Sequence, residues 1–146
     1  MAEDVVVAKI KKSSVSEVWV SAKEFNNKLV CDIREYFHPA DNPDWLPTKK
    51  GASIPPDLLG RAVDAVEEMA RRDGVGEVCE LPRGKNAKIR FAICEYQKHI
   101  YAEIRTYYTE SSNSGEWKPG KGVTIPLRML GQLAEALRLA EDHMGN

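Results

Sequence analysis

Residues 33–37 read Ile-Arg-Glu-Tyr-Phe, and residues 104–108, 71 positions further along the chain, read Ile-Arg-Thr-Tyr-Tyr. The same offset relates the segment 51–60 to the segment 122–131, which share their first and last glycines and an Ile-Pro pair. Agreement at one fixed offset over most of the chain indicates two copies of a single small module.

The two modules are predicted to span residues 1–74 and 75–146. A unit of roughly 70 residues buries only a modest core and is marginally stable alone. We therefore expect the modules to pack on each other as an intramolecular pseudo-dimer. Such a protein offers either two equivalent surfaces or one long continuous surface.

The chain has 146 residues, 42% of them hydrophobic and 29% charged, as in an ordinary soluble globular protein. It has neither an apolar run long enough to span a membrane nor a signal peptide, so no membrane partner is expected. Cys31, Cys79 and Cys94 form no Cys-x-x-Cys pair. An intracellular location is expected, in the cytoplasm or nucleoid of a prokaryote or the nucleus of a eukaryote. The scattered histidines predict no metal site, and no cofactor is expected.

The net charge of −1 is unevenly distributed along the chain. Residues 55–70 carry one arginine and four acids, and residues 126–146 carry two arginines and three acids. These are the segments expected to be helical, so the rest of the chain is mildly basic. That asymmetry is compatible with a basic sheet surface that meets nucleic acid.

Each module is predicted to be ββββα, an α+β fold with an antiparallel sheet joined by hairpins. Segments rich in β-branched residues or with alternating polarity predict strands; they are residues 5–10, 17–21, 29–37 and 52–54, and then 78–81, 88–92, 100–108 and 123–125. Asn26-Asn27 suits a tight hairpin turn, and Gln97-Lys98 occupies the same place with poorer turn chemistry. Polar loops at 38–45 and 109–117 each end in tryptophan, and basic glycine turns at 49–51 and 118–122 follow.

Apolar residues at helical spacing predict one helix per module. In the first module they are Leu59, Ala62, Val63, Val66 and Ala70. The corresponding residues in the second module are Leu130, Leu133, Ala134, Leu137 and Ala140. The two apolar stripes are candidates to pack on each other.

The order of these elements and their residues resemble the transcriptional coactivator family called positive cofactor four. That family carries a signature close to Asp-Phe-Lys-Gly-Lys, a strand ending Asp-Ile-Arg-Glu-Tyr-Trp, and a basic glycine loop before a short strand and a helix. The matching segments are residues 24–28, 31–37 and 46–51, and again 95–99, 103–108 and 118–122.

The resemblance implies a curved four-stranded antiparallel sheet with a C-terminal helix. Family members dimerise through the helices and adjoining sheet, and two facing β-ridges grip single-stranded DNA. The tandem chain looks like such a dimer with both of its subunits contained in one polypeptide. It lacks the serine- and lysine-rich tail of eukaryotic members, which favours a prokaryotic or phage-type version.

The resemblance places base-stacking aromatic side chains at Phe25 and Tyr96, where the alternative is a turn aromatic that caps the core. Phe37 and Tyr108 stand where the family has tryptophan. Strand alternation puts Phe37 on the side of Ile33 and favours the core, whereas a bend or bulge at the strand end would turn it outward. Stacking on such aromatic faces holds single strands without reading their sequence.

Cations that follow the backbone are the second requirement for binding a single strand. Arg34 and Arg105 are candidates for phosphate or base contacts, with ion pairs to Asp32 and Glu103 as the alternative. The lysines near the aromatic residues are candidate phosphate ligands, with plain solvated surface as the alternative; they are Lys28, Lys49, Lys50, Lys98, Lys118 and Lys121.

The tryptophans are predicted to have mainly structural positions. Trp45 and Trp117 are interpreted as structural residues that pack under the long loops. The alternative is that bases stack on them. Trp19 is expected in the core.

No arrangement of residues indicates catalysis, and the sequence predicts a protein that is not an enzyme. The predicted function is sequence-tolerant binding of single-stranded DNA, as a transcription cofactor or in DNA maintenance. Alternatives are a single-stranded RNA binder, or an interaction adaptor of the transcription machinery with weak DNA binding. Further association into a homo-oligomer is also left open.

Overall fold

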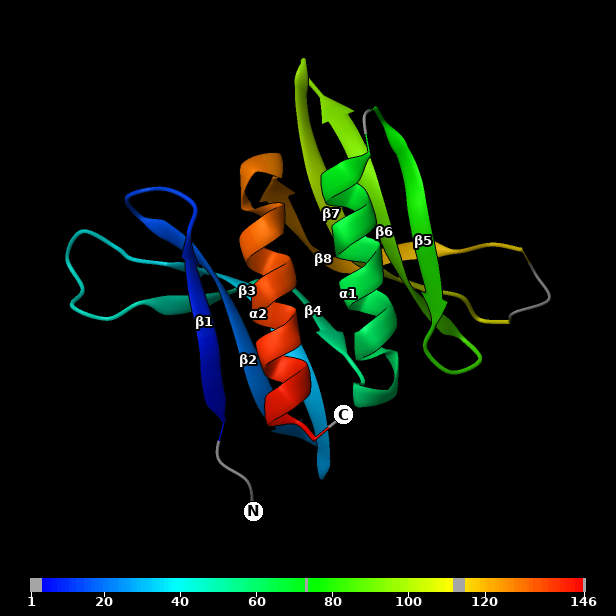
Figure 1. The fold of residues 1–146 in the computed structure, drawn as a ribbon, viewed down its shortest axis with the longest axis horizontal. Coiled ribbons are helices and arrows are strands. Elements are labelled where there is room, and N and C mark those ends of the chain that lie inside the picture. The colour runs from blue at the N-terminus through cyan, green and yellow to red at the C-terminus, as the bar shows by residue number, and fades with distance from the viewer. Residues whose placement is uncertain (1–3, 73, 112–114, 146) are drawn as a thin grey trace.

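The structure, a computed structural model, describes residues 4–72, 74–111 and 115–145. In these residues four strands and a helix are followed by a second set in the same order (Figure 1). The first set is β1 (Val5–Lys11), β2 (Ser16–Phe25), β3 (Lys28–Phe37), β4 (Leu46–Ile54) and α1 (Pro56–Arg71). The second set is β5 (Gly76–Pro82), β6 (Ala87–Tyr96), β7 (His99–Tyr108), β8 (Lys118–Pro126), the short 3-10 helix η1 (Leu127–Met129) and α2 (Leu130–His143).

Each set of strands forms its own antiparallel sheet, in the order β1-β2-β3-β4 or β5-β6-β7-β8. Alternation of side chains gives each sheet one apolar face. In β2, for example, Val18 and Val20 are fully buried on that face. The prediction of two ββββα units with antiparallel sheets is confirmed.

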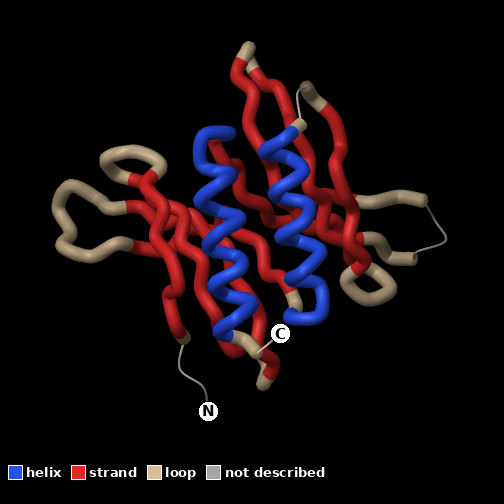
Figure 2. The backbone as a smooth tube through the Cα atoms, viewed as in Figure 1, coloured by secondary structure: helices blue, strands red, loops and turns tan. Residues whose placement is uncertain are grey.

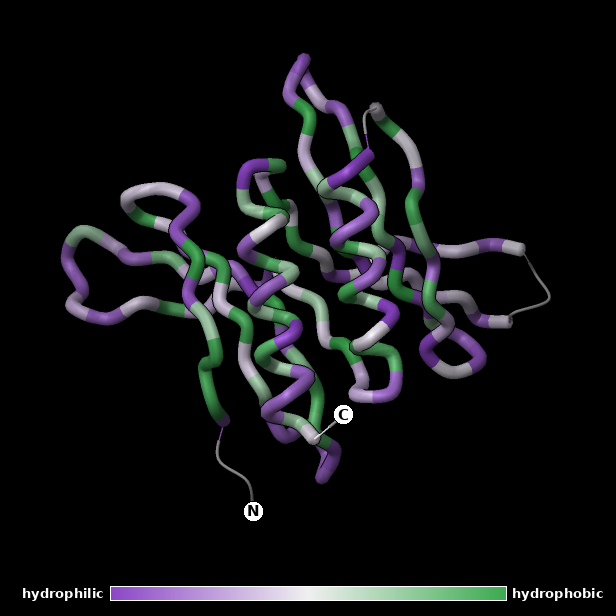
Figure 3. The backbone as a smooth tube through the Cα atoms, viewed as in Figure 1, coloured by the Kyte–Doolittle hydropathy of each residue, from purple (hydrophilic) through white to green (hydrophobic). Residues whose placement is uncertain are grey.

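The two helices lie side by side and antiparallel across the middle of the molecule (Figures 1 and 2). Helix α1 follows the first sheet but also packs on β5 and β6 of the second, while α2 packs on β1 and β2 of the first. The buried side chains of both sheets and both helices therefore form one hydrophobic cluster. Hydrophobic stretches of the strands lie beneath the helices, and the tips of the β2–β3 and β6–β7 hairpins are hydrophilic (Figure 3).

Two expectations about these elements are wrong. The lysine and glycine segments at 49–51 and 118–122 are not turns but parts of β4 and β8, whose pairing with β3 and β7 resumes on both sides of an irregularity at Lys49-Lys50 and Gly120-Lys121. In α1 the buried stripe ends at Met69, and Ala70 is exposed.

Trp19 is also not a core residue. It is half-buried on the face of the first sheet that lies away from Val18 and Val20. There its ring stacks on Tyr36 with ring centroids 3.8 Å apart, and Lys9 Nζ lies 4.2 Å from its ring centroid. Its register partner on β3 is Arg34. The first sheet therefore carries an aromatic and cationic outer face.

The tryptophans that end the two long loops are both half-buried. The Trp45 ring lies 5.0 Å from that of His38, and Lys88 Nζ lies 4.4 Å from the centre of the Trp117 ring. Each tryptophan thus packs against its own module.

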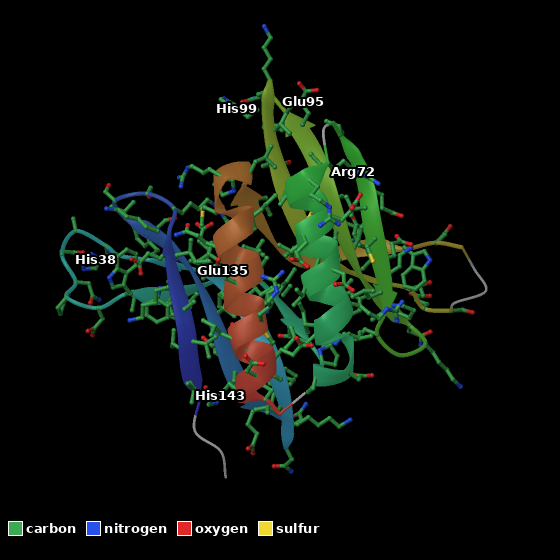
Figure 4. All side chains as sticks on the ribbon, in the orientation of Figure 1. His38, Arg72, Glu95, His99, Glu135 and His143 are labelled. Atoms are coloured by element: carbon green, nitrogen blue, oxygen red, sulfur yellow. The ribbon has the colours of Figure 1, made fainter. Side chains whose placement is uncertain are left out.

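The histidines lie far apart, with His99 at the β6–β7 tip, His38 in the loop after β3 and His143 at the end of α2 (Figure 4). No group of three or more metal-ligating side chains gathers in the described part of the chain. Among the same residues, no helix is long and apolar enough to cross a membrane.

We expect Gly131→Ala to raise the free energy of unfolding by about 0.5–1 kcal/mol, because alanine loses less backbone entropy than glycine in a helix. A Cβ atom added at Gly131 would have no atom within 4 Å. At the equivalent Gly60 the new Cβ would stand 3.1 Å from Glu141 Oε2, so Gly60→Ala should gain less. Urea unfolding of both variants checks this, and a loss of stability in Gly131→Ala would contradict it.

Candidate nucleic-acid interface

The β2–β3 hairpin presents an aromatic residue and a lysine at its tip. Asn26 and Asn27 have φ values of 51° and 61°, the left-handed conformation that a two-residue hairpin turn needs. Phe25 and Lys28 pair on either side of this turn. Phe25 is 65% exposed, which removes the interpretation of a core-capping aromatic.

The β6–β7 hairpin has the same geometry despite its different turn sequence. Gln97 and Lys98 have φ values of 50° and 68°. Tyr96 pairs with His99 across the turn and is 65% exposed, as Phe25 is. The strand pairing thus imposes on Gln97 and Lys98 a conformation that asparagine adopts more easily.

Arg34 is fixed by a buried carboxylate in the middle of the first sheet. Its Nε donates to Asp32 Oδ2 at 3.1 Å and its Nη2 to Asp32 Oδ1 at 3.0 Å, while Nη1 donates to the Thr48 carbonyl at 2.8 Å. A Cβ atom on Gly51 would stand 2.7 Å from Arg34 Cζ, so the guanidinium lies directly against this glycine. Lys23 Nζ lies 3.4 Å from Asp32 Oδ2 and adds a second cation.

Arg105 repeats this arrangement in the second sheet. Its Nη1 donates to the Gly120 carbonyl at 2.7 Å and its Nη2 to Glu103 Oε2 at 3.1 Å. Gly122 lies beneath it as Gly51 lies beneath Arg34. The ion pairs expected for both arginines are present, and their contacts with phosphate or bases stay a prediction.

Phe37 and Tyr108 end their strands with exposed rings, at 43% and 50% exposure. The pairing of β3 with β4 shifts register between Arg34 and Tyr36, and that of β7 with β8 shifts at the matching place. Such bulges bend and twist a strand pair. The pairing of β3 with β2 stays in register through Phe37, so its exposure excludes the core interpretation without showing that a bulge turned it to the other face.

The Tyr108 ring lies against the backbone of β8. A Cβ atom on Gly120 would stand 2.9 Å from Tyr108 Cδ2 and 3.1 Å from the Thr106 carbonyl oxygen. Only glycine leaves room for the ring in this position.

The lysines predicted to contact phosphate are all exposed. Lys49 and Lys50 lie in the irregular part of β4, and Lys118 and Lys121 lie in β8. Their placement in strands rather than turns sets them at fixed positions beside the arginines.

A groove of about 720 Å³ runs between the outer face of the first sheet and the end of the β7–β8 pair. We call it the inter-module groove. Its lining from the first module includes Lys23, Phe25, Asp32, Arg34 and Lys49. Its lining from the second module comprises Arg83, Thr106, Tyr108 and Lys121.

The inter-module groove therefore gathers five of the residues predicted from the sequence: Phe25, Arg34, Lys49, Tyr108 and Lys121. The other predicted residues do not line it; they are Lys28, Phe37, Lys50, Tyr96, Lys98, Arg105 and Lys118. Two of these are close by. Lys28 lines a neighbouring hollow of about 560 Å³ together with Arg83, and Lys118 lines one of about 310 Å³ together with Tyr108.

Sequence reasoning missed Lys23 and Arg83 as members of the groove. Lys23 lies two residues before Phe25 in the same strand and thus on the same face, a signal that the sequence offered. Arg83 lies in the turn after β5, and only the packing of one module on the other brings it to the first sheet.

The sequence profile of the family described as Transcriptional Coactivator p15 (PC4) matches residues 12–61 and 84–136. Two crystal forms of a PC4 homolog from Burkholderia pseudomallei are similar to part of the chain. The orthorhombic form is 25% identical over 50% of this chain and 100% of that one, with a TM-score of 0.44. The tetragonal form is 23% identical over 47% of this chain and 100% of that one, also with a TM-score of 0.44.

A search of curated protein sequences found no match. The two segments that match the family profile together make up more than half of the chain and contain the hairpins, the paired arginines and most of the groove. The chain therefore belongs to the family of the transcriptional coactivator p15 (PC4).

Proposed function

We propose that this protein binds single-stranded DNA in the inter-module groove, with little dependence on base sequence. The observation that carries the proposal is the gathering of two exposed aromatic rings, Phe25 and Tyr108, with cations from both modules. Single strands are held by stacking of bases on aromatic faces and by cations that follow the phosphates. Membership of a coactivator family supports a role in transcription or DNA maintenance.

The chemistry of the groove favours a single strand over a duplex. Bases in a duplex stack on each other, and their faces are not free to meet Phe25 or Tyr108. A separated strand offers a face on every base, whatever its identity, so stacking confers affinity without sequence preference.

The residues of the groove divide into two roles in this proposal. Phe25 and Tyr108 stack bases, and Lys49, Arg83 and Lys121 neutralise phosphates. Arg34 is held by Asp32 and Thr48, so it presents a fixed donor group at the floor of the groove. The predicted residues outside the groove would extend the path of a longer strand.

Fluorescence anisotropy titration tests the function directly. A labelled single strand of roughly 20 nucleotides, its duplex and its RNA counterpart are compared at one salt concentration. We expect the DNA single strand to bind more tightly than the duplex. Tighter binding of the RNA would assign the groove to RNA, and equally weak binding of all three would contradict the proposal and favour the adaptor function.

The salt dependence of binding should identify the phosphate contacts. For single strands, each neutralised phosphate contributes about −0.7 to the slope of log K against log salt. We expect Lys49→Ala to make this slope shallower by about 0.7.

Arg71→Ala provides the matched control for this experiment. Arg71 is exposed at the end of α1 and pairs with Glu68 at 2.9 Å, outside the groove. Its removal should leave the slope unchanged. An unchanged slope in Lys49→Ala, or an equal change in Arg71→Ala, would contradict the assignment of Lys49 to a phosphate.

A further inference from the structure

The repeat places a second set of residues at positions equivalent to the lining of the inter-module groove. Tyr96 and Phe37 are the counterparts of Phe25 and Tyr108, and both are exposed. If the modules were identical, the protein would have two equal sites. The charged residues at the two positions differ, however.

In the inter-module groove, three cations have no partner that would neutralise them. Lys49, Arg83 and Lys121 form no ion pair with any residue in the ranges 4–72, 74–111 and 115–145. A cation that forms no ion pair is available to an incoming phosphate.

The counterpart of Arg83 is Lys12, whose charge is already neutralised. Its Nζ lies 2.6 Å from Glu35 Oε1 and donates to the Thr124 carbonyl at 3.3 Å. Glu35 stands where the groove has the uncharged Thr106. The position around Tyr96 and Phe37, which we call the second position, thus contains one more acid than the groove, and its cation Lys12 already has two partners.

The counterpart of Lys23 is Cys94, which brings no positive charge. Burial, with a contribution from Glu103, raises the pKa of this thiol above its usual range, so it is neutral near pH 7. In the groove, Lys23 and Arg34 share the carboxylate of Asp32, whereas at the other position Arg105 alone faces Glu103, so that position has one positive charge fewer.

The bulge of β8 is one residue shorter than that of β4, and the second position therefore has one lysine fewer. Arg34 contacts both the Thr48 carbonyl and Gly51, and Lys49 and Lys50 lie between these two residues in the sequence. Arg105 spans from the Gly120 carbonyl to Gly122, with only Lys121 between them. At the common offset Lys50 corresponds to Lys121 and Lys49 corresponds to Gly120, so the second module has no lysine at the position of Lys49.

We propose that the two pseudo-equivalent positions are unequal, and that the inter-module groove is the primary single-strand site while the position around Tyr96 and Phe37 is a weak one. This inference rests on the proposed function. It means that the chain binds a strand preferentially at one of its two pseudo-equivalent positions, which a symmetric dimer of identical modules does not do.

Two matched substitutions test the inequality. Phe25→Ala and Tyr96→Ala remove equally exposed rings from equivalent hairpin tips. At low salt, with a strand too short to reach both positions, we expect a loss of roughly tenfold for Phe25→Ala and less than about twofold for Tyr96→Ala. Equal losses would overturn the inequality and leave the function standing, whereas no loss from either variant would overturn the function as well.

Glu35→Gln tests the same inference by gain of affinity. The substitution keeps an oxygen that Lys12 can donate to and removes the opposing charge, so binding at the weak position should strengthen severalfold. Glu68→Gln makes the same change of charge on α1, in a pair with Arg71, and serves as the control. The Phe25→Ala background isolates the weak position. A gain no larger than that of the control would contradict the proposed cause of the inequality.

Discussion

Replacing Phe25 and Tyr108 together by alanine is expected to weaken binding of single-stranded DNA by about 30-fold or more, because each stacked base is worth roughly 1–3 kcal/mol. The two rings come from different modules and line one groove. Both are at least half exposed, so their removal should leave the fold intact. Anisotropy titration gives the affinity, and circular dichroism confirms that the variant is folded.

The matched control keeps the aromatic faces and exchanges only the hydroxyl group. Phe25→Tyr with Tyr108→Phe should bind within about twofold of the unchanged protein, since stacking uses the ring face. If the alanine variant retains its affinity, bases do not stack on these rings. If the control loses affinity as well, binding depends on the hydroxyl group removed from Tyr108 or the one added at residue 25, and not on the ring faces alone.

Leu133→Ala is expected to lower the free energy of unfolding by about 2–5 kcal/mol, as for other buried leucines. Leu133 is fully buried in α2, within the cluster that joins both sheets. Because each helix also packs on the sheet of the other module, both modules should unfold in one transition. Leu139→Ala, at a position 55% exposed on the same helix, should cost much less.

Urea unfolding, followed by tryptophan fluorescence and by far-ultraviolet circular dichroism, measures the free energy of unfolding and the number of transitions. Trp19 and Trp45 report on the first module and Trp117 on the second. Coincident transitions with both probes are expected. Two separated transitions, or a loss in Leu133→Ala no larger than in Leu139→Ala, would contradict a shared core.

The repeat offset and the alternation of side chains were sufficient to predict the ββββα order and the hairpin at Asn26-Asn27. They were not sufficient for β4. A run of two lysines and a glycine is typical of a turn, but Gly51 pairs with Arg34 of β3 and Pro47 pairs with Tyr36, so the lysines between them lie within strand β4. The contacts with the neighbouring strand thus determine the conformation of this segment, although its residues locally favour a turn.

The site was predicted less completely than the fold, for a geometric reason. The apolar stripes of the helices indicate which face is buried but not which sheet covers it, so the packing of α1 on β5 and β6 could not be read from them. The inter-module groove depends on that packing, because it joins β7 and β8 to the first sheet. Consequently Arg83 was missed, and Tyr96 could not be distinguished from Phe25.

Photo-crosslinking of a substituted single strand is the most direct test of the proposed path. A strand of roughly 20 nucleotides with one 5-iododeoxyuridine would be irradiated in the complex, and the crosslinked peptides identified by mass spectrometry. The account predicts crosslinks at Phe25 and Tyr108, with few at Tyr96. Crosslinks confined to the surface of α1 and α2, or none on either side of the groove, would contradict it.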